Sequence, residues 1–284
     1  MINTWWFNII VSLTLFVIYN LVIKKALNKC VNDGAVISLI EFLAGIIILI
    51  LCPFFKWQFP TDIKVYLLLF VSCIFYAITD RILATARNGL EVSSYGILQQ
   101  TSSIFIFIWG ILFFKEPIII KKIIGLLLII FGNILVLYKK GNFSLKNKYV
   151  LFSFLGNLFF SIGVSIDVGI SEQFNLPFYV SMTLTVPAIL IILMNRIKLK
   201  SVINEFKVGD KKSILIVSSI WGLMICTKLR AYQFGTFSTV TIVNATSVIL
   251  NVIAAYFFLK EKDSVIKKII AAILVAIGTI LAKI

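Results

Sequence analysis

The feature that most constrains this chain is a series of long apolar runs, one of which contains six consecutive Ile and Leu residues at 46–51. A helix that crosses a bilayer needs about 20 mostly apolar residues, because each residue adds only about 1.5 Å of length. The sequence contains ten such runs, at residues 5–23, 35–55, 64–84, 92–114, 118–138, 149–168, 178–195, 213–232, 236–259 and 266–283. Only 14% of the residues are Asp, Glu, Lys or Arg, too few to cover a water-soluble fold. The sequence therefore predicts an all-α membrane protein with ten transmembrane helices.

The composition argues against several classes of function. Histidine, the commonest general base and metal ligand, is absent, and the four cysteines form no CxxC pair. The net charge of +15 comes from Lys and Arg residues between the apolar runs, as in loops at a membrane surface rather than in a nucleic-acid site. No nucleotide-binding motif is found. We therefore expect no enzyme activity, metal, cofactor or nucleic-acid partner.

The chain repeats itself at an offset of 145 residues. Residues 92–116 match residues 237–261 at nine of 25 positions, including a Lys-Glu pair at the end of each segment. Two domains follow, 1–140 and 146–284, each with five predicted spans. Because five is odd, the second half enters the membrane from the opposite side, so the sequence predicts two inverted five-helix repeats. Secondary transporters are commonly built in this way.

The Lys and Arg residues indicate how the chain is oriented. Nineteen of the 27 lie in predicted loops on one side, at residues 24–34, 81–91, 139–148, 196–212 and 260–268, and eight lie on the other side. The positive-inside rule places the richer side in the cytoplasm and both termini outside. The frequent Ile, Lys and Asn residues are typical of an AT-rich bacterial genome, so we expect a multi-pass protein of the bacterial cytoplasmic membrane.

Polar residues within the predicted spans are the candidate substrate-binding residues, because a polar group in hydrocarbon must face protein or a water-filled path. Positions that are polar in both repeats are the strongest candidates, and Gln99 with Asn244 is the leading pair. Hydrogen bonds that only hold the helices together, and apolar packing of the aromatic rings, are the alternatives. The full set is Asn8, Ser12, Tyr19, Glu41, Tyr76, Gln99, Ser102, Asn157, Trp221, Asn244 and Ser247.

Glu41 is the candidate whose side chain most restricts the possible chemistry, because it is acidic and lies within a predicted span. It is the seventh residue of its span, about 10 Å inside, so its carboxylate must be paired, protonated or bound to a cation. Proton coupling and contact with a cationic group of a substrate are the functional hypotheses, and a structural ion pair is the alternative. Asp80 is the second candidate for proton coupling. Asp80, Asp167 and Lys228 lie near span ends, where an interfacial position is the simpler interpretation.

Four features occur in a characteristic order: the ten spans in two sets of five, residues 113–116 and 258–261 with their Lys-Glu ends, the glycines Gly132 and Gly278, and residues 19–24 at the end of span one. In these features the chain resembles the EamA-like branch of the drug/metabolite transporter superfamily. The resemblance implies a small-molecule carrier whose cavity is built from spans one to four and six to nine, with spans five and ten peripheral. It also implies cytoplasmic termini, against the charge count.

We therefore expect a secondary transporter that moves a small polar metabolite by alternating access, driven by a proton or a counter-substrate. Glu41 favours a cationic or zwitterionic substrate such as an amino acid or an amine, and the resemblance favours export. A flippase for a lipid-linked headgroup is the alternative function. Small residues of span ten leave open whether they pack two protomers into a homodimer or helices of one chain; they are Ala272, Ala276, Gly278 and Ala282.

Overall fold

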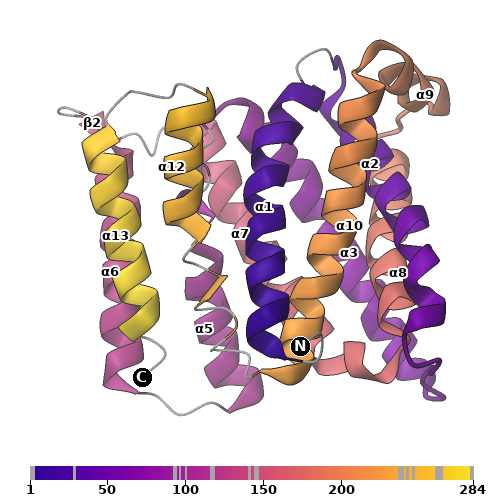
Figure 1. The fold of residues 1–284 in the computed structure, drawn as a ribbon, viewed down its shortest axis with the longest axis horizontal. Coiled ribbons are helices and arrows are strands. Elements are labelled where there is room, and N and C mark those ends of the chain that lie inside the picture. The colour runs from indigo at the N-terminus through magenta and orange to yellow at the C-terminus, as the bar shows by residue number, and fades with distance from the viewer. Residues whose placement is uncertain are drawn as a thin grey trace.

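The computed structural model is a bundle of helices (Figure 1). It describes residues 4–27, 30–91, 95, 97–99, 101–115, 119–139, 142–143, 147–235, 240, 243–244, 247–259 and 265–281. The first half contains α1 (Trp5–Leu27), α2 (Asp33–Ile48) with the 3-10 helix η1 (Leu49–Phe54), α3 (Ile63–Asn88), α5 (Thr101–Phe114) and α6 (Ile120–Leu137). The second half contains α7 (Lys148–Ile170) with η3 (Ser171–Gln173), α8 (Leu176–Met194), α9 (Leu199–Val208), α10 (Lys211–Phe234), α12 (Ser247–Leu259) and α13 (Val265–Leu281). A two-residue antiparallel ladder of β1 (Tyr138–Lys139) and β2 (Asn142–Phe143) lies between the halves.

Six of the described helical segments are long and apolar enough to cross a membrane: α1, α2 with η1, α3, α7, α8 and α10. They coincide with six of the ten predicted spans, so the prediction of an all-helical membrane protein is confirmed. The other four predicted spans overlap α5, α6, α12 and α13. Parts of the spans at 92–114 and 236–259 lie outside the described residues, as do Glu116, Lys260 and Glu261 of the repeated motif. The count of ten therefore stays a prediction.

The spans begin where polar residues can satisfy the free amide groups of a first helical turn. Four helix starts have an Asn or Asp side chain that accepts a hydrogen bond from a backbone amide one turn on. The pairs are Asn32 with Ala35 (3.0 Å), Asp62 with Lys64 (2.9 Å), Asn147 with Tyr149 (3.0 Å) and Asn175 with Phe178 (3.2 Å). These short polar residues mark the points at which the apolar runs begin.

Helices from the two halves pack against each other in pairs. The main pairs are α1 with α10, α3 with α7, α2 with α8, and α6 with α13, and further contacts join α5 to α7 and α12 to α1. Figure 1 shows α6 and α13 at one edge of the bundle and α1, α7, α3 and α10 nearer its middle. The start of α1 and the end of α13 lie at the same end of the molecule, opposite α9 (Figure 1).

The connection at 196–212 contains α9, a helix that the span analysis does not predict. Glu205 of α9 is buried and accepts hydrogen bonds from the amides of Val31 (3.2 Å) and Asn32 (3.0 Å), which fixes α9 over the start of α2. Its outer face exposes Leu199 and Ile203, whose side chains lie among lysines. Exposed apolar residues flanked by Lys are typical of a helix that lies in a membrane interface.

Glycine permits the close approach of α6 and α13. A Cβ atom on Gly278 would lie 2.5 Å from the carbonyl oxygen of Gly125, and one on Gly132 would lie 3.0 Å from the carbonyl oxygen of Ala271. Ala272 and Ala276 are buried in the same chain. The small residues of α13 therefore pack within one chain, and the expectation of a homodimer loses the observation on which it rested. Ala282 lies outside the described residues.

We predict that Gly278→Val lowers the thermal stability of the purified protein, because overpacking a close helix contact costs about 1–3 kcal/mol. The neighbouring Ile277→Val is the matched control, since Ile277 is 44% exposed on the same helix. The measurement is the thermal unfolding temperature in detergent. Equal unfolding temperatures for the two variants would show that α6 and α13 are not in close contact.

Candidate functional site

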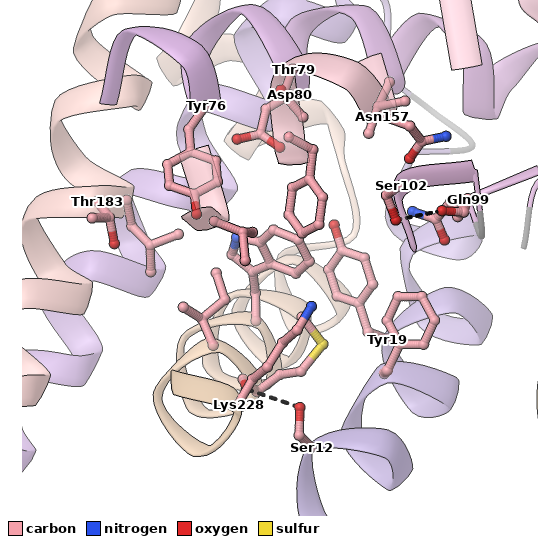
Figure 2. Close-up of a pocket in the computed structure, with 18 of the residues that line it drawn as sticks. Ser12, Tyr19, Tyr76, Thr79, Asp80, Gln99, Ser102, Asn157, Thr183 and Lys228 are labelled. Atoms are coloured by element: carbon pink, nitrogen blue, oxygen red, sulfur yellow. Dashed lines mark hydrogen bonds between the residues drawn. The ribbon is translucent and has the colours of Figure 1, made fainter. Parts of the chain in front are cut away.

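A central cavity lies between the helix pairs (Figure 2), and it contains about 1230 Å³ of empty space when its open mouth is included. Side chains from α1, α2, α3, α5, α7, α8 and α10 line it, together with Tyr95, Gln99 and Asn244. No described residue of α6 or α13 lines it. This arrangement agrees with a cavity built from spans one to four and six to nine.

Most of the predicted substrate-binding residues meet at this cavity. Those that line it are Ser12, Tyr19, Tyr76, Gln99, Ser102, Asn157, Trp221 and Asn244, and Asp80 lines it as well. Asn8, Glu41 and Ser247 are buried but are not part of its lining. The side-chain amide of Asn8 donates to the carbonyl oxygen of Thr4, just before α1, at 2.8 Å, so its amide nitrogen has a local partner.

Two of the lining residues also hold helices together. Ser12 Oγ donates to the carbonyl oxygen of Met224 at 3.1 Å and so joins α1 to α10. Asn157 Nδ2 donates to the carbonyl oxygen of Leu98 (3.1 Å) and to Thr101 Oγ1 (3.0 Å), which joins α7 to the start of α5. The alternative of bundle-stabilising hydrogen bonds therefore applies to this pair.

Gln99 keeps an unused acceptor at the cavity. Its Nε2 donates to the Tyr95 hydroxyl at 3.2 Å, and its backbone carbonyl accepts from Ser102 Oγ at 2.7 Å. Its Oε1 has no hydrogen-bond partner among the described residues. A buried acceptor without a partner is costly, so a bound molecule with a donor group would be stabilised there.

Aromatic rings form much of the remaining wall. The rings of Tyr19 and Trp221 stack with centroids 4.6 Å apart and an interplanar angle of 29°. Tyr76 lies 6.2 Å from Phe160, centroid to centroid. Gly163 makes room for Tyr76, because a Cβ atom there would lie 3.0 Å from the ring. The cavity thus combines flat apolar surfaces with a few directed polar groups, as small-molecule sites do.

The interfacial interpretation of Asp167 is wrong. Asp167 is 2% exposed and lines the cavity, where its carboxylate accepts hydrogen bonds from the Tyr76 hydroxyl (2.7 Å) and the Tyr179 hydroxyl (2.6 Å). These bonds connect α7 to α3 and α8. Two hydroxyl donors satisfy a carboxylate that would otherwise be costly to bury.

Arg87 is a cavity residue that the sequence analysis missed. The predicted span ends at residue 84, but α3 continues to Asn88 and brings Arg87 over the cavity. Its guanidinium donates to the hydroxyls of Tyr19 (3.2 Å) and Tyr95 (3.5 Å) and lies 5.3 and 5.2 Å from the two ring centroids. Arg87 could have been predicted as a cavity residue only if the predicted helix had been extended past residue 84.

Glu41 of α2 and Asp80 of α3 form a pair of carboxyl groups, the first fully buried and the second half-buried at the cavity. Glu41 is fully buried, and neither of its carboxyl oxygens has a hydrogen-bond partner among the described residues. The charged side chains that interact with it are Asp80 and Arg87. Asp80 lines the cavity, whereas Glu41 lies behind it. A substrate in the cavity can therefore contact Asp80 directly but not Glu41.

Lys228 is the second basic residue of the cavity lining, which corrects its interfacial interpretation. It lies on α10 with its ammonium 5.1 Å from the centroid of the Phe160 ring. With Arg87 it places two cations at the cavity. The cavity wall therefore holds basic as well as acidic groups.

Residues 3–138 match the sequence model of the EamA-like transporter family. The first half of the chain is therefore similar in sequence to the EamA-like family. The resemblance drawn from the sequence is thereby confirmed, and the family suggests a membrane transporter. No curated protein matches the chain in sequence. Seventeen solved chains match in structure. One of them is a crystal structure that is 12% identical, with a TM-score of 0.64. The match covers 97% of this chain and 95% of the other, and it shows a shared fold only.

We predict that Asp167→Ala destabilises the protein by about 1–3 kcal/mol, because two buried tyrosine hydroxyls lose their acceptor. Tyr76→Phe and Tyr179→Phe each remove a single donor and should cost less. The exposed Glu172→Ala, close by in η3, is the control for loss of an acidic residue. Thermal unfolding in detergent measures all four. If Asp167→Ala unfolds at the same temperature as Glu172→Ala, the carboxylate does not join these helices.

Proposed function

We propose that this protein is a secondary transporter that moves a small zwitterionic metabolite, such as an amino acid, across the bacterial cytoplasmic membrane by alternating access, in the direction of export. The observation that carries the proposal is the paired composition of the cavity wall. Eighteen of its 26 residues form nine pairs at the repeat offset of 145. The pairs are Ser12/Asn157, Tyr19/Val164, Tyr76/Trp221, Thr79/Met224, Asp80/Ile225, Leu83/Lys228, Ala84/Leu229, Arg87/Tyr232 and Gln99/Asn244.

The helix contacts support the same symmetry. Exchanging each helix with its counterpart in the other half turns the α1–α10 pair into α7–α3, and α5–α7 into α12–α1. The same exchange leaves the α2–α8 and α6–α13 pairs unchanged, because each contains a helix and its own counterpart. In Figure 1, α6 and α13 run in opposite directions, as inverted halves require. Two such halves can open a central site to either side of the membrane with similar energy.

The charges at the cavity favour a substrate that carries both signs. Asp80 and Asp167 offer carboxylates, whereas Arg87 and Lys228 offer cations. A purely cationic substrate, which Glu41 alone would favour, leaves the two basic residues without a role. An amino acid supplies an ammonium for the first group and a carboxylate for the second, and its side chain fits the aromatic wall.

The Glu41–Asp80 pair supports coupling to protons. Two carboxyl groups that share one buried position cannot both be ionised at low cost, so the pair holds a proton more readily than a lone carboxylate. The charged and titratable groups around it are Arg87, Tyr19, Tyr76 and Tyr95. Because Asp80 faces the cavity, a substrate ammonium bound there would favour release of that proton. This exchange would let protons moving inward down their gradient drive export of the substrate.

We predict that purified protein in liposomes moves labelled amino acids saturably, and that an opposing proton gradient increases the rate. Glu41→Gln should lower the rate several-fold and remove its dependence on the gradient, because the carboxyl pair is lost. The exposed Glu172→Gln is the matched control and should behave as the unmodified protein. Radiolabel exchange with and without a pH difference measures both effects.

The same liposomes test the alternative function. A flippase for a lipid-linked headgroup would move a fluorescent lipid between leaflets and leave the soluble amino acids behind. That result would replace the proposed carrier. A Glu41→Gln protein whose rate still responds to the gradient would leave the carrier in place and remove the carboxyl pair from its coupling.

The basic loops and α9 support an orientation in which α9 lies at the cytoplasmic face and both termini lie outside. Single-cysteine labelling can test it in the native background. Burial and the neighbouring Glu205 raise the pKa of the Cys30 thiol to about 12, which makes it unreactive, and Cys52, Cys73 and Cys226 are buried. A cysteine placed on an exposed loop should therefore react far faster than the native ones.

We predict that a membrane-impermeant maleimide labels Thr61→Cys in intact cells, whereas Lys200→Cys is labelled only after the membrane is opened. Both positions are exposed. Thr61 precedes α3 in the chain, and Lys200 follows α8. Gel-shift detection of the labelled protein gives the measurement. The reverse pattern would place the termini in the cytoplasm, as the family resemblance implies.

A further inference from the structure

We propose that Lys228 recognises an anionic group, a carboxylate or a phosphate, of the molecule that the cavity binds; this rests on the proposed function in taking the cavity as the substrate site. Lys228 lies well inside α10, 17 residues after its first residue, Lys211. Its side chain extends toward the centre of the cavity (Figure 2). Its ammonium is therefore placed where a bound molecule would lie.

The other three charged residues of the described cavity wall already have partners. Asp167 accepts hydrogen bonds from two tyrosine hydroxyls, and Arg87 donates to two others. Asp80 interacts with Glu41 and with the Arg87 guanidinium. Each of these groups therefore has a protein partner when the cavity is empty, although Arg87 Nε has no hydrogen-bond partner among the described residues.

Lys228 differs from all three. Its contact among the described residues is the face of the Phe160 ring, 5.1 Å from the ammonium. Its side chain is half-buried at the cavity, and no described residue forms an ion pair with its ammonium. A cation–π contact offsets only part of the cost of removing an ammonium from water. An anionic group in the cavity would supply the missing compensation.

The surroundings of Lys228 also restrict the ligand. Phe160 and Trp221 are part of the same wall, so the anionic group should be attached to an apolar or aromatic portion. A small hydrated anion would leave these surfaces uncovered. We infer an amphipathic anion or zwitterion, and we expect an amine that lacks the anionic group to bind weakly.

Thermal stabilisation of the purified protein by matched compounds tests this inference. Phenylalanine and 3-phenylpropionate carry a carboxylate, whereas phenylalaninamide and phenethylamine keep the ring without it. Glycerol 3-phosphate and a short-chain phosphatidylglycerol test a phosphate from a soluble metabolite and from a lipid. We expect stabilisation by members of the anionic set and none by the amide and the amine.

Substitutions then assign the effect to Lys228. Lys228→Met should weaken binding of the stabilising anion at least about tenfold, because a charge-assisted hydrogen bond is lost. Lys228→Arg should retain most of it. The exposed Lys212→Met, near the start of the same helix, is the matched control and should bind as the unmodified protein.

The ligand-free proteins give a second, independent readout. If Lys228 has no structural partner, Lys228→Met removes a half-buried charge without leaving a partner group behind, so its unfolding temperature should stay equal or rise. If Lys228 has a structural partner, the same substitution should lower it. Loss of anion binding together with unchanged or higher stability is the signature of a recognition residue.

Three results would overturn the inference: stabilisation by the amine and amide alone, anion binding that persists in Lys228→Met, or a failure of every anion to stabilise the unmodified protein. Binding is measured in detergent without a gradient, so it is separate from transport. Anion binding at Lys228 without movement of any solute would overturn the proposed carrier and leave the recognition role intact. Stabilisation by the lipid phosphate alone would keep the role and favour the flippase.

Discussion

The cost of placing a polar or charged group in hydrocarbon governs this structure. Each charge inside the bundle must be paired, protonated or in contact with a water-filled path. Asp80, Arg87, Asp167 and Lys228 all meet that requirement in one place, at the wall of the central cavity. The cavity therefore lies where charged side chains gather, because apolar packing alone would leave these charges without compensation. The peripheral helices α6 and α13 have no such groups at the cavity and instead pack closely through glycine.

The sequence allowed the helical spans to be predicted because a bilayer imposes a length and an apolar character that few other folds share. It also allowed polar positions such as Gln99 and Asn244 to be predicted as cavity residues, because they recur in both repeats. The positions of Asp167, Lys228 and Arg87 could not be predicted in this way. Counting residues from the end of a span gives the position of a residue along its helix but not the side that its side chain faces. In addition, the cavity extends further along α3, α7 and α10 than the apolar runs indicate.

Glu41 illustrates the difference between depth and environment. It lies away from both ends of α2 and is fully buried. Its neighbours could not be read from the sequence, because Asp80 and Arg87 belong to another helix. An isolated Glu41 carboxylate would attract a cation. With Asp80 and Arg87 beside it, Glu41 is instead one member of a carboxyl pair next to a guanidinium. A direct substrate contact is thereby replaced by an indirect one through Asp80.

The paired positions of the cavity wall divide into two kinds. Ser12/Asn157, Tyr76/Trp221 and Gln99/Asn244 keep a polar or an aromatic character in both halves. The charged positions do not: Asp80 corresponds to Ile225, and Lys228 corresponds to Leu83. A duplicated framework supplies the symmetry that two alternative conformations need. Charges that occur in one half only give the site a polarity, so a bound zwitterion would have a single preferred orientation. Selectivity for the substrate would then reside in the unduplicated residues, and the capacity to open toward either side in the duplicated ones.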